Sequence, residues 1–161
     1  MGRKAQDGRQ DPPHPRQEPR IPLPLTAESL ERTFRACADF SRREIALAGD
    51  EAQRVELFFL AGMVRMERVN DYILRPMAQD AGLRACRDMA AVRARMAAGA
   101  LYSLSAAPVN TMDAAAAALV SGSCLILFPG EREALAVDAG TEEKRSISPP
   151  ENETAVKGPR E

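Results

Sequence analysis

The stretch VELFFLAGM, residues Val55–Met63, decides which fold this chain is expected to adopt. It is almost continuously apolar and rich in Val, Phe and Leu, which is typical of a strand covered on both faces. The adjoining run, MERVNDYILRPMAQ, predicts an amphipathic helix with one apolar face. That face consists of Met66, Val69, Ile73 and Met77. Because proline fits poorly inside a helix, Pro76 is expected to end or kink it near Leu74 or Arg75.

Upstream of this strand, the sequence predicts one helix and one further strand. Thr26 can cap the helix, and Glu28 lies in its first turn. Apolar residues recur at helical spacing as far as an expected end near Asp39. The stretch FSRREIALAGD, residues 40–50, then alternates apolar and polar side chains before a Gly-Asp turn. This alternation predicts a half-buried strand.

Downstream, the pattern predicts two helices followed by short strands. LRACRDMAAVRARMA, residues 83–97, carries the narrow apolar stripe of a helix, and SAAPVN, residues 105–110, indicates a loop. Thr111 caps a second, short helix that Gly122 should stop. The expected strands are SCLILF, EALAVD and KRSI, residues 123–128, 133–138 and 144–147. The element order predicts an α/β fold, with α+β as the alternative, and a mixed sheet of about four to five strands flanked by helices.

Proline and charge divide the chain into three parts. Residues 1–25 hold six of the twelve prolines, several arginines and the only histidine, and are expected to form a disordered leader. Residues 26–148 are expected to form the α/β subdomain. Residues 149–161 are interpreted as a connector, because their three prolines would stiffen an extended segment and Gly158 would let it turn.

The composition is that of an ordinary folded chain, with 45% apolar residues, 28% charged residues and a net charge of -1. This balance predicts neither nucleic acid nor an anionic membrane surface as a partner. The three cysteines are far apart and odd in number, which fits a reducing compartment better than a disulfide framework. The longest uncharged runs, residues 96–112 and 114–130, are too short and too interrupted to span a bilayer. The chain is therefore expected to be soluble.

The sequence shows no combination of residues that is typical of a catalytic or metal site. The single histidine, His14, lies in the leader, so no Ser-His or Cys-His pair and no histidine metal site is expected. SGSC, residues 121–124, is interpreted as a helix stop rather than a nucleophile turn, because it lacks the closing glycine of that motif. We therefore expect no catalytic residue, no metal ligand and no cofactor. Carboxylates alone can still support acid-base catalysis.

Two sets of charged residues are interpreted as solvated surface. The acidic set lies in predicted turns and comprises Glu131, Glu133, Glu142 and Glu143. The basic set lies on one predicted helix and comprises Arg84, Arg87, Arg93 and Arg95. Asp88 interrupts the basic set and no aromatic residue is interleaved with it, so the pattern does not favour RNA or DNA binding.

The final stretch, RSISPPENETAVKGPRE, carries the most specific pattern in the chain. It resembles a signature of the A subunit of GerA-type spore germinant receptors, close to R-S-[IV]-x-x-P-x-[TS]-E-x-V-[VI]-[RK]-G-P-[RK]-E. The matching residues are Arg145, Ser146, Ile147, Pro150, Glu153, Val156, Lys157, Gly158, Pro159, Arg160 and Glu161. The chain departs from the pattern at Asn152, where the family has Thr or Ser, and at Ala155, where it has Val.

Two upstream stretches resemble the same family in the same order. LAGMVRMERVNDYILRPM, residues 60–77, is similar to its strand followed by a helix ending in Y-I-L-R-P-[LM]. AALVSGSCLILFPGEREALAVDAG, residues 117–140, is similar to its helix-glycine-strand segment and the hairpin after it. The resemblance covers roughly residues 26–161.

The resemblance implies a non-enzymatic subunit of a nutrient receptor in the inner membrane of bacterial spores. In that family, the A subunit has two soluble α/β subdomains and then membrane helices. It works with B and C subunits and with other A subunits, and it is thought to assemble into an ion-release channel. This chain would be the first soluble subdomain, on the cytoplasmic side. The second subdomain and the membrane helices are missing from it, so it would meet the membrane only through those absent parts.

The resemblance also indicates where contact residues are expected. They lie at Arg75 and in the connector at Lys157, Gly158, Pro159, Arg160 and Glu161. The implied function is signal transmission or receptor assembly, with sheet and hairpin edges as protein contacts. The alternatives are a stand-alone ligand-binding α/β domain, a carboxylate-dependent enzyme, or a regulator that occupies the same contacts on an intact receptor.

Overall fold

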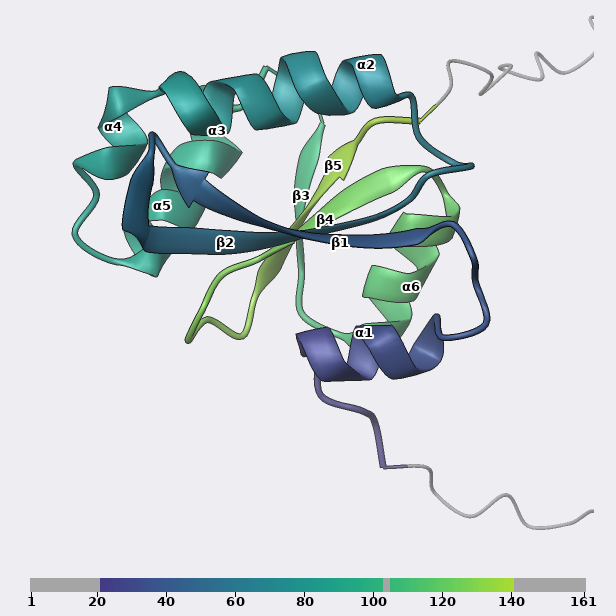
Figure 1. Ribbon diagram of the computed structural model, residues 1–161. Helices are drawn as coiled ribbons and strands as arrows, with labels where there is room; N and C mark the ends of the chain where they lie inside the picture. Colours follow the sequence, from purple (N-terminus) through teal and green to yellow (C-terminus); the bar gives the residue numbers. More distant parts are fainter. Residues whose placement is uncertain (1–20, 103–104, 141–161) are drawn as a thin grey trace, which may run out of the picture.

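The computed structural model describes residues 21–102 and 105–140. Within these ranges the strands form one five-stranded sheet in the order β1-β2-β4-β5-β3 (Figure 1). Its strands are β1 Phe40–Leu47, β2 Asp50–Leu60, β3 Ala106–Val109, β4 Ser123–Leu127 and β5 Ala134–Asp138. The expected α and β fold with about four to five strands is confirmed. The sheet was expected to be mixed, but all four pairings between these strands are antiparallel.

Helices cover both faces of the sheet (Figure 1). On one face lie α1 and α6, and on the other lie the remaining helical segments. The first pair is α1 Ala27–Thr33 and α6 Met112–Val120. The second set is α2 Met66–Arg68, η1 Val69–Leu74, α3 Arg75–Gln79, α4 Ala81–Arg84, α5 Met89–Arg95 and η2 Met96–Ala100, where η marks a π-helical turn. This arrangement provides both faces of the central strands with an apolar cover.

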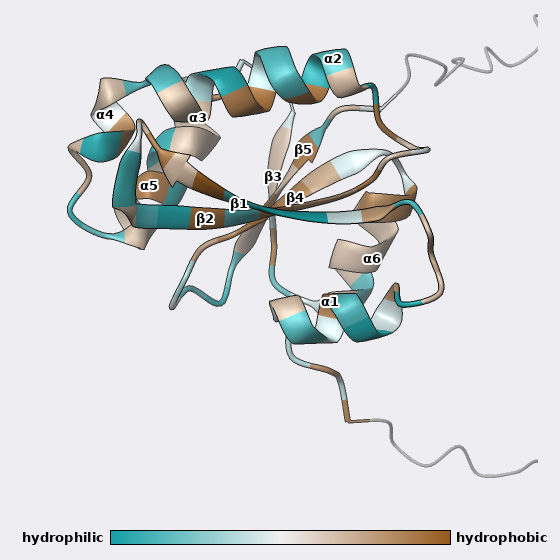
Figure 2. Cartoon of the chain, viewed as in Figure 1, coloured by the Kyte–Doolittle hydropathy of each residue, from teal (hydrophilic) through white to brown (hydrophobic). Residues whose placement is uncertain are grey.

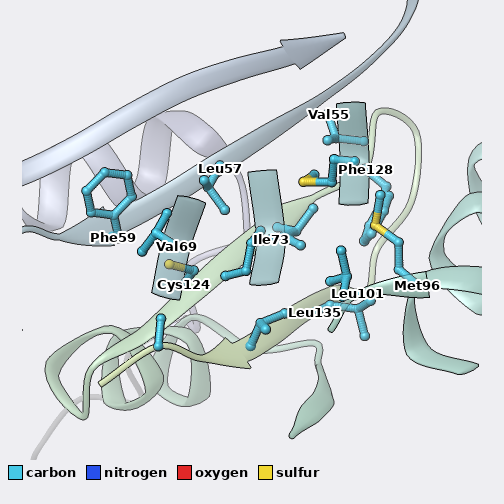
Figure 3. Close-up of a cluster of buried hydrophobic side chains, with 14 of the residues drawn as sticks. Val55, Leu57, Phe59, Val69, Ile73, Met96, Leu101, Cys124, Phe128 and Leu135 are labelled. Atoms are coloured by element: carbon cyan, nitrogen blue, oxygen red, sulfur yellow. The ribbon is translucent and has the colours of Figure 1, made fainter. Parts of the chain in front are cut away.

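Strand β2 contributes to two separate hydrophobic cores, as its sequence predicts. Leu57 and Phe59 point into the core under α2 to α5, and Phe58 and Leu60 point into the core under α1 and α6. Figure 2 shows brown, apolar residues on the central strands, with teal residues spread over the outer surfaces of the helices. Figure 3 shows the first core, where Leu57 from β2 lies near Ile73 from η1. Complete burial of each such side chain contributes roughly 1.5–3 kcal/mol.

The helix after β2 continues through Pro76 instead of ending at Leu74 or Arg75. The backbone widens into a π-turn, in which the Arg75 N–H donates to the Asn70 carbonyl. Pro76 has no N–H to offer the carbonyl of Tyr72 four residues earlier. The N–H of Tyr102 donates to that carbonyl instead, at 3.0 Å. A tertiary hydrogen bond therefore replaces the helical one, and the helix extends to Gln79.

Other elements also differ from the sequence predictions, and the buried strand runs over Asp50–Leu60 instead of Val55–Met63. The first helix ends at Thr33 rather than near Asp39, and turns follow it. The helix predicted over residues 83–97 is divided into α4 and α5, because Asp88 has extended backbone and caps α5 through the Ala91 N–H. The loop predicted at residues 105–110 contains strand β3, which pairs with the otherwise open side of β5. The predicted strand at 144–147, the connector and most of the leader lie outside the described residues.

Candidate functional site

The described chain leaves its last strand through a closed backbone junction, formed by residues 63–65, Gly122 and residues 139–140, which we call the exit junction. Val64 forms an isolated antiparallel bridge with Gly140. The Arg65 N–H donates to the Ala139 carbonyl at 2.8 Å, and the Ala139 N–H donates to the Gly122 carbonyl at 3.2 Å. The loop between β2 and α2, the end of α6 and the end of β5 are therefore joined by backbone hydrogen bonds.

Gly122 is the residue that allows these three segments to meet. Its φ of +88° lies in the left-handed region, which favours glycine. A Cβ on Gly122 would lie 2.6 Å from the Met63 carbonyl oxygen and 2.9 Å from the Gly140 Cα. The same glycine follows the C-cap of α6, so the interpretation of SGSC as a helix stop is confirmed. The sequence identified the stop, but it did not show the contacts across the junction.

The helix that starts after the exit junction is attached to it by a side chain. Arg68 donates from Nη1 to the Gly140 carbonyl at 3.2 Å. Gly140 is also held through its N–H, which donates to Asp138 Oδ1 at 3.1 Å. Both backbone groups of the last described residue are thus bonded within the domain. The backbone of Gly140 is consequently held in place by side chains of the domain.

Arg75, the one predicted contact residue within the described ranges, lies on the solvent side of the same helix. Its side chain is 58% exposed and forms an ion pair with Asp71 at 2.9 Å, one helical turn earlier. Arg75 comes seven residues after Arg68, roughly 10 Å along the helix axis. The other predicted contact residues, Lys157 to Glu161, lie outside the described part of the chain. Arg75 is therefore available on the surface for a contact.

A hollow of about 650 Å³ lies at the far end of this helix. Its lining includes Gln79, Asp80, Arg95, Gly99 and Tyr102. Asp80 and Arg95 form a bidentate ion pair, with Nε to Oδ2 at 3.2 Å and Nη2 to Oδ1 at 3.0 Å. Asp80 also caps α4 by accepting from the Gly82 N–H at 2.8 Å. The hydrogen bonds from Arg95 lower the pKa of the Asp80 carboxyl, so this group stays ionised at neutral pH.

The titratable groups with shifted pKa values are not poised for proton transfer near neutral pH. Asp80 is held in its charged form, whereas burial raises the pKa of the Cys124 thiol to about 12. A thiol with such a pKa stays protonated and is a poor nucleophile. Among residues 21–102 and 105–140, no three His, Cys, Asp or Glu side chains form a group that could hold a metal ion.

Part of the charge interpreted as solvated surface joins separate elements instead. Arg93 of α5 forms ion pairs with Glu131, at 3.7 Å, and with Glu133 in the β4–β5 turn. Arg95 pairs with Asp80, as described above. The sequence analysis did not predict these pairs. Their partners are 15 to 40 positions apart in the sequence, and no local pattern predicts that such distant residues meet.

The two edge strands of the sheet differ in what they offer a partner. β3 is four residues long and contains Pro108, which has no N–H. β1 is eight residues long, and its central residues are exposed. On β1, Arg42 pairs with Glu31 at 2.7 Å and with Glu56, while Glu44 pairs with Arg54 at 3.1 Å. Charged side chains on an edge strand oppose indiscriminate strand pairing.

Two comparisons with known proteins found a match for this chain. The family model described as Bacillus/Clostridium GerA spore germination protein matches residues 28–161. The chain belongs to the GerA spore germination family. A search of curated proteins found no match.

A solved structure shares the fold. It is the crystal structure of the N-terminal domain of the A subunit of the Bacillus megaterium spore germinant receptor GerK3. The TM-score is 0.59 and the sequence identity 14%, over 75% of this chain and 49% of the solved chain. The chain therefore spans about half the length of this structural relative. None of the helices described here has the length and apolar composition needed to cross a membrane.

Replacing Gly122 tests whether the exit junction depends on close backbone contact. Gly122→Ala should destabilise the protein more than Gly130→Ala. Gly130 also has a left-handed φ, +80°, but its Cβ would meet nothing within 4 Å. The left-handed conformation costs roughly 1–2 kcal/mol at either site. The crowding at Gly122 should add about 1–3 kcal/mol, measured by urea unfolding. Equal destabilisation of the two variants would contradict the role of the close contact.

The Asp80–Arg95 pair should make stability depend on acid pH. Because the pKa of Asp80 is lowered in the folded state, the ion pair stabilises the fold at pH values above the usual carboxyl pKa. This stabilisation is lost as the pH falls through the usual carboxyl pKa and below it. In Asp80→Asn, the side chain can still cap α4 but cannot titrate. The free energy of unfolding should therefore fall less steeply with acidification in Asp80→Asn than in the parent chain. Identical slopes would show that the pair contributes nothing to folding.

Proposed function

We propose that this chain is the first soluble subdomain of the A subunit of a nutrient germinant receptor, where it serves receptor assembly or signal transmission. The family match over residues 28–161 is the observation that carries this proposal. The fold shared with the N-terminal domain of the GerK3 A subunit supports it. In this proposal residues 26–148 form the subdomain, residues 1–25 are its leader, and residues 149–161 connect it to a second subdomain.

The exit junction supports a role in transmission. A signal that crosses from one subdomain to the next can pass through the connecting chain. The last described residue, Gly140, has its N–H and its carbonyl both hydrogen-bonded to side chains of the domain. A displacement of the sheet would therefore move the start of the connecting chain with it. A loosely attached connection would absorb such a displacement instead.

The expected partners are the B and C subunits of the receptor and other A subunits. We place the parent protein in the spore inner membrane, with this part on the cytoplasmic side and the membrane attachment in parts outside this chain. The exposed surface around Arg75 and the edge of β1 are the contact surfaces that the fold offers. Nucleic acid is not an expected partner, since the net charge of the chain is -1.

The alternative functions would use the hollow beside Asp80. A ligand-binding domain needs polar groups that are free to meet a ligand, and a carboxylate enzyme needs a carboxyl whose pKa lies near the working pH. Asp80 already forms two hydrogen bonds with Arg95, and its pKa is lowered. These observations favour a structural role for the pair over either alternative.

Replacing Arg75 in the parent gene tests the proposed function in spores. Arg75 is exposed, so Arg75→Ala should leave the fold intact while weakening a receptor contact. A contact worth 1.4 kcal/mol changes an equilibrium about tenfold, so germination on nutrients should slow by that order. The rate is measured as release of dipicolinic acid. Germination triggered by an agent that bypasses nutrient receptors should not change.

The matched control is Arg84→Ala, since Arg84 is an exposed arginine on α4. A fall in receptor abundance in the inner membrane of Arg75→Ala spores would assign the contact to assembly, and unchanged abundance would assign it to signalling. If deletion of the parent gene leaves the response to every nutrient unchanged, the receptor role is wrong.

A further inference from the structure

The hollow at the end of α3 contains an arginine whose position two neighbours fix. Arg95 of α5 donates two hydrogen bonds to the Asp80 carboxylate, at 3.2 and 3.0 Å. Its guanidinium also lies against Gly82 of α4, where a Cβ would collide with it. Figure 1 shows α3, α4 and α5 together at one end of the sheet. Because these contacts restrict its rotamers, Arg95 is ordered before any partner arrives.

One edge of this guanidinium is left open. A guanidinium carries five N–H donors in a planar fork. Asp80 accepts from Nε and Nη2, and Nη1 has no hydrogen-bond partner in the part of the chain that the structure describes. Arg95 lines the hollow, and its side chain is 47% exposed. The group that best fits the open edge is a second carboxylate, which accepts two parallel hydrogen bonds.

Both tyrosines of the chain lie beside this arginine and are exposed. Tyr102 lines the hollow and is 61% exposed. Tyr72 is 41% exposed, and its carbonyl accepts from the Tyr102 N–H at 3.0 Å. The five phenylalanines, in contrast, are all buried or half-buried. Tyrosine and arginine are the residue types that contribute most to binding in protein–protein interfaces.

The hollow is too open to enclose a small molecule. Pockets for small ligands bury about 70–90% of the ligand surface. Here Gln79, Arg95 and Tyr102 all stand in contact with solvent, so a small molecule would stay largely in water. A protein surface would cover the hollow and its rim together. The shape therefore favours a protein segment as the occupant.

The charge of the surrounding helices indicates which kind of protein fits. Residues 61–102 contain seven arginines and four acidic residues, a net charge of +3 in a chain whose total is -1. This excess attracts an acidic partner. At the hollow itself Asp80 balances the charge of Arg95, so binding there depends on hydrogen-bond geometry more than on net charge. A carboxylate supplies that geometry, whereas a diffuse anionic surface gains little from it.

We propose that the hollow and its two tyrosines form a docking site for an acidic segment of a partner protein. An aspartate or glutamate carboxylate of the partner binds the open edge of Arg95, and apolar neighbours of that residue contact Tyr72 and Tyr102. The structural role of the ion pair is part of this arrangement, because Asp80 holds the arginine in place. The inference does not depend on the receptor role proposed above.

A short peptide tests the site in the full 161-residue chain. The probe is the tripeptide Leu-Glu-Leu, acetylated and amidated so that the glutamate side chain carries its only charge. Its addition should shift the NMR signals of the Arg95 Nε–H and the Tyr102 amide until they saturate. The neutral tripeptide Leu-Gln-Leu should bind at least about tenfold more weakly, because it offers no charged acceptor.

Three variants separate the positioned arginine from general attraction to positive charge. Gly82→Ala keeps every charged group but displaces the Arg95 guanidinium, and it should weaken binding of Leu-Glu-Leu about tenfold. The helix should persist, since alanine is a better helix former than glycine. Tyr102→Ala should also weaken binding, while the preference for glutamate over glutamine stays. Arg84→Ala, at an exposed arginine of the same helix, should change nothing.

Three results would overturn the inference. The first is equal binding of the glutamate and glutamine peptides. The second is an equal effect of Gly82→Ala and Arg84→Ala, because this would reduce the site to ordinary surface charge. The third is that vesicles of phosphatidylglycerol and phosphatidylcholine shift the Arg95 and Tyr102 signals while Leu-Glu-Leu does not, because this would assign the surface to an anionic membrane.

Discussion

Burial of the central strands on both faces is the constraint on which the rest of the structure depends. In β2, Leu57 and Phe59 enter one core while Phe58 enters the other, and each is at most 2% exposed. Strand β4 does the same with Leu125 and Ile126. A sheet of this kind is stable only if both faces are covered. The segment between β2 and β4 must therefore supply helices to one face and then, through α6, to the other.

Because both faces of the sheet are covered, distant backbone segments come into close contact at two places. Local structure alone would not favour the backbone conformation at either place. At Pro76 the helix loses a hydrogen bond, and the Tyr102 N–H replaces it from a distant part of the sequence. At Gly122 the chain must turn with positive φ while two other backbone segments lie against it. Both solutions join elements that are far apart in the sequence. The second also holds the last described residue, Gly140, against the end of α6 and the loop after β2.

The features predicted from the sequence are those with a strong local signal. The apolar run at Val55–Met63 predicted the buried strand, and Thr111 and Gly122 predicted both ends of α6. The features that were missed depend on distant partners. Strand β3 exists because β5 has an open side, and Asp88 interrupts a helical pattern by capping its own helix. The sequence contained no sign of the contact between Met63, Gly122 and Gly140 other than the presence of Gly122. The three segments are far apart in the sequence, and they crowd together only in the folded chain.

The central claim is that the exit junction belongs to the cooperative core of the domain and is not a loose end. Native-state hydrogen exchange tests it most directly, at the amides of Arg65 and Ala139, which donate to the carbonyls of Ala139 and Gly122. We expect both amides to exchange with the same free energy as the amides of β4, which requires global unfolding. If they exchange with a much smaller free energy, the junction opens locally, and the chain beyond Gly140 is not mechanically joined to the sheet.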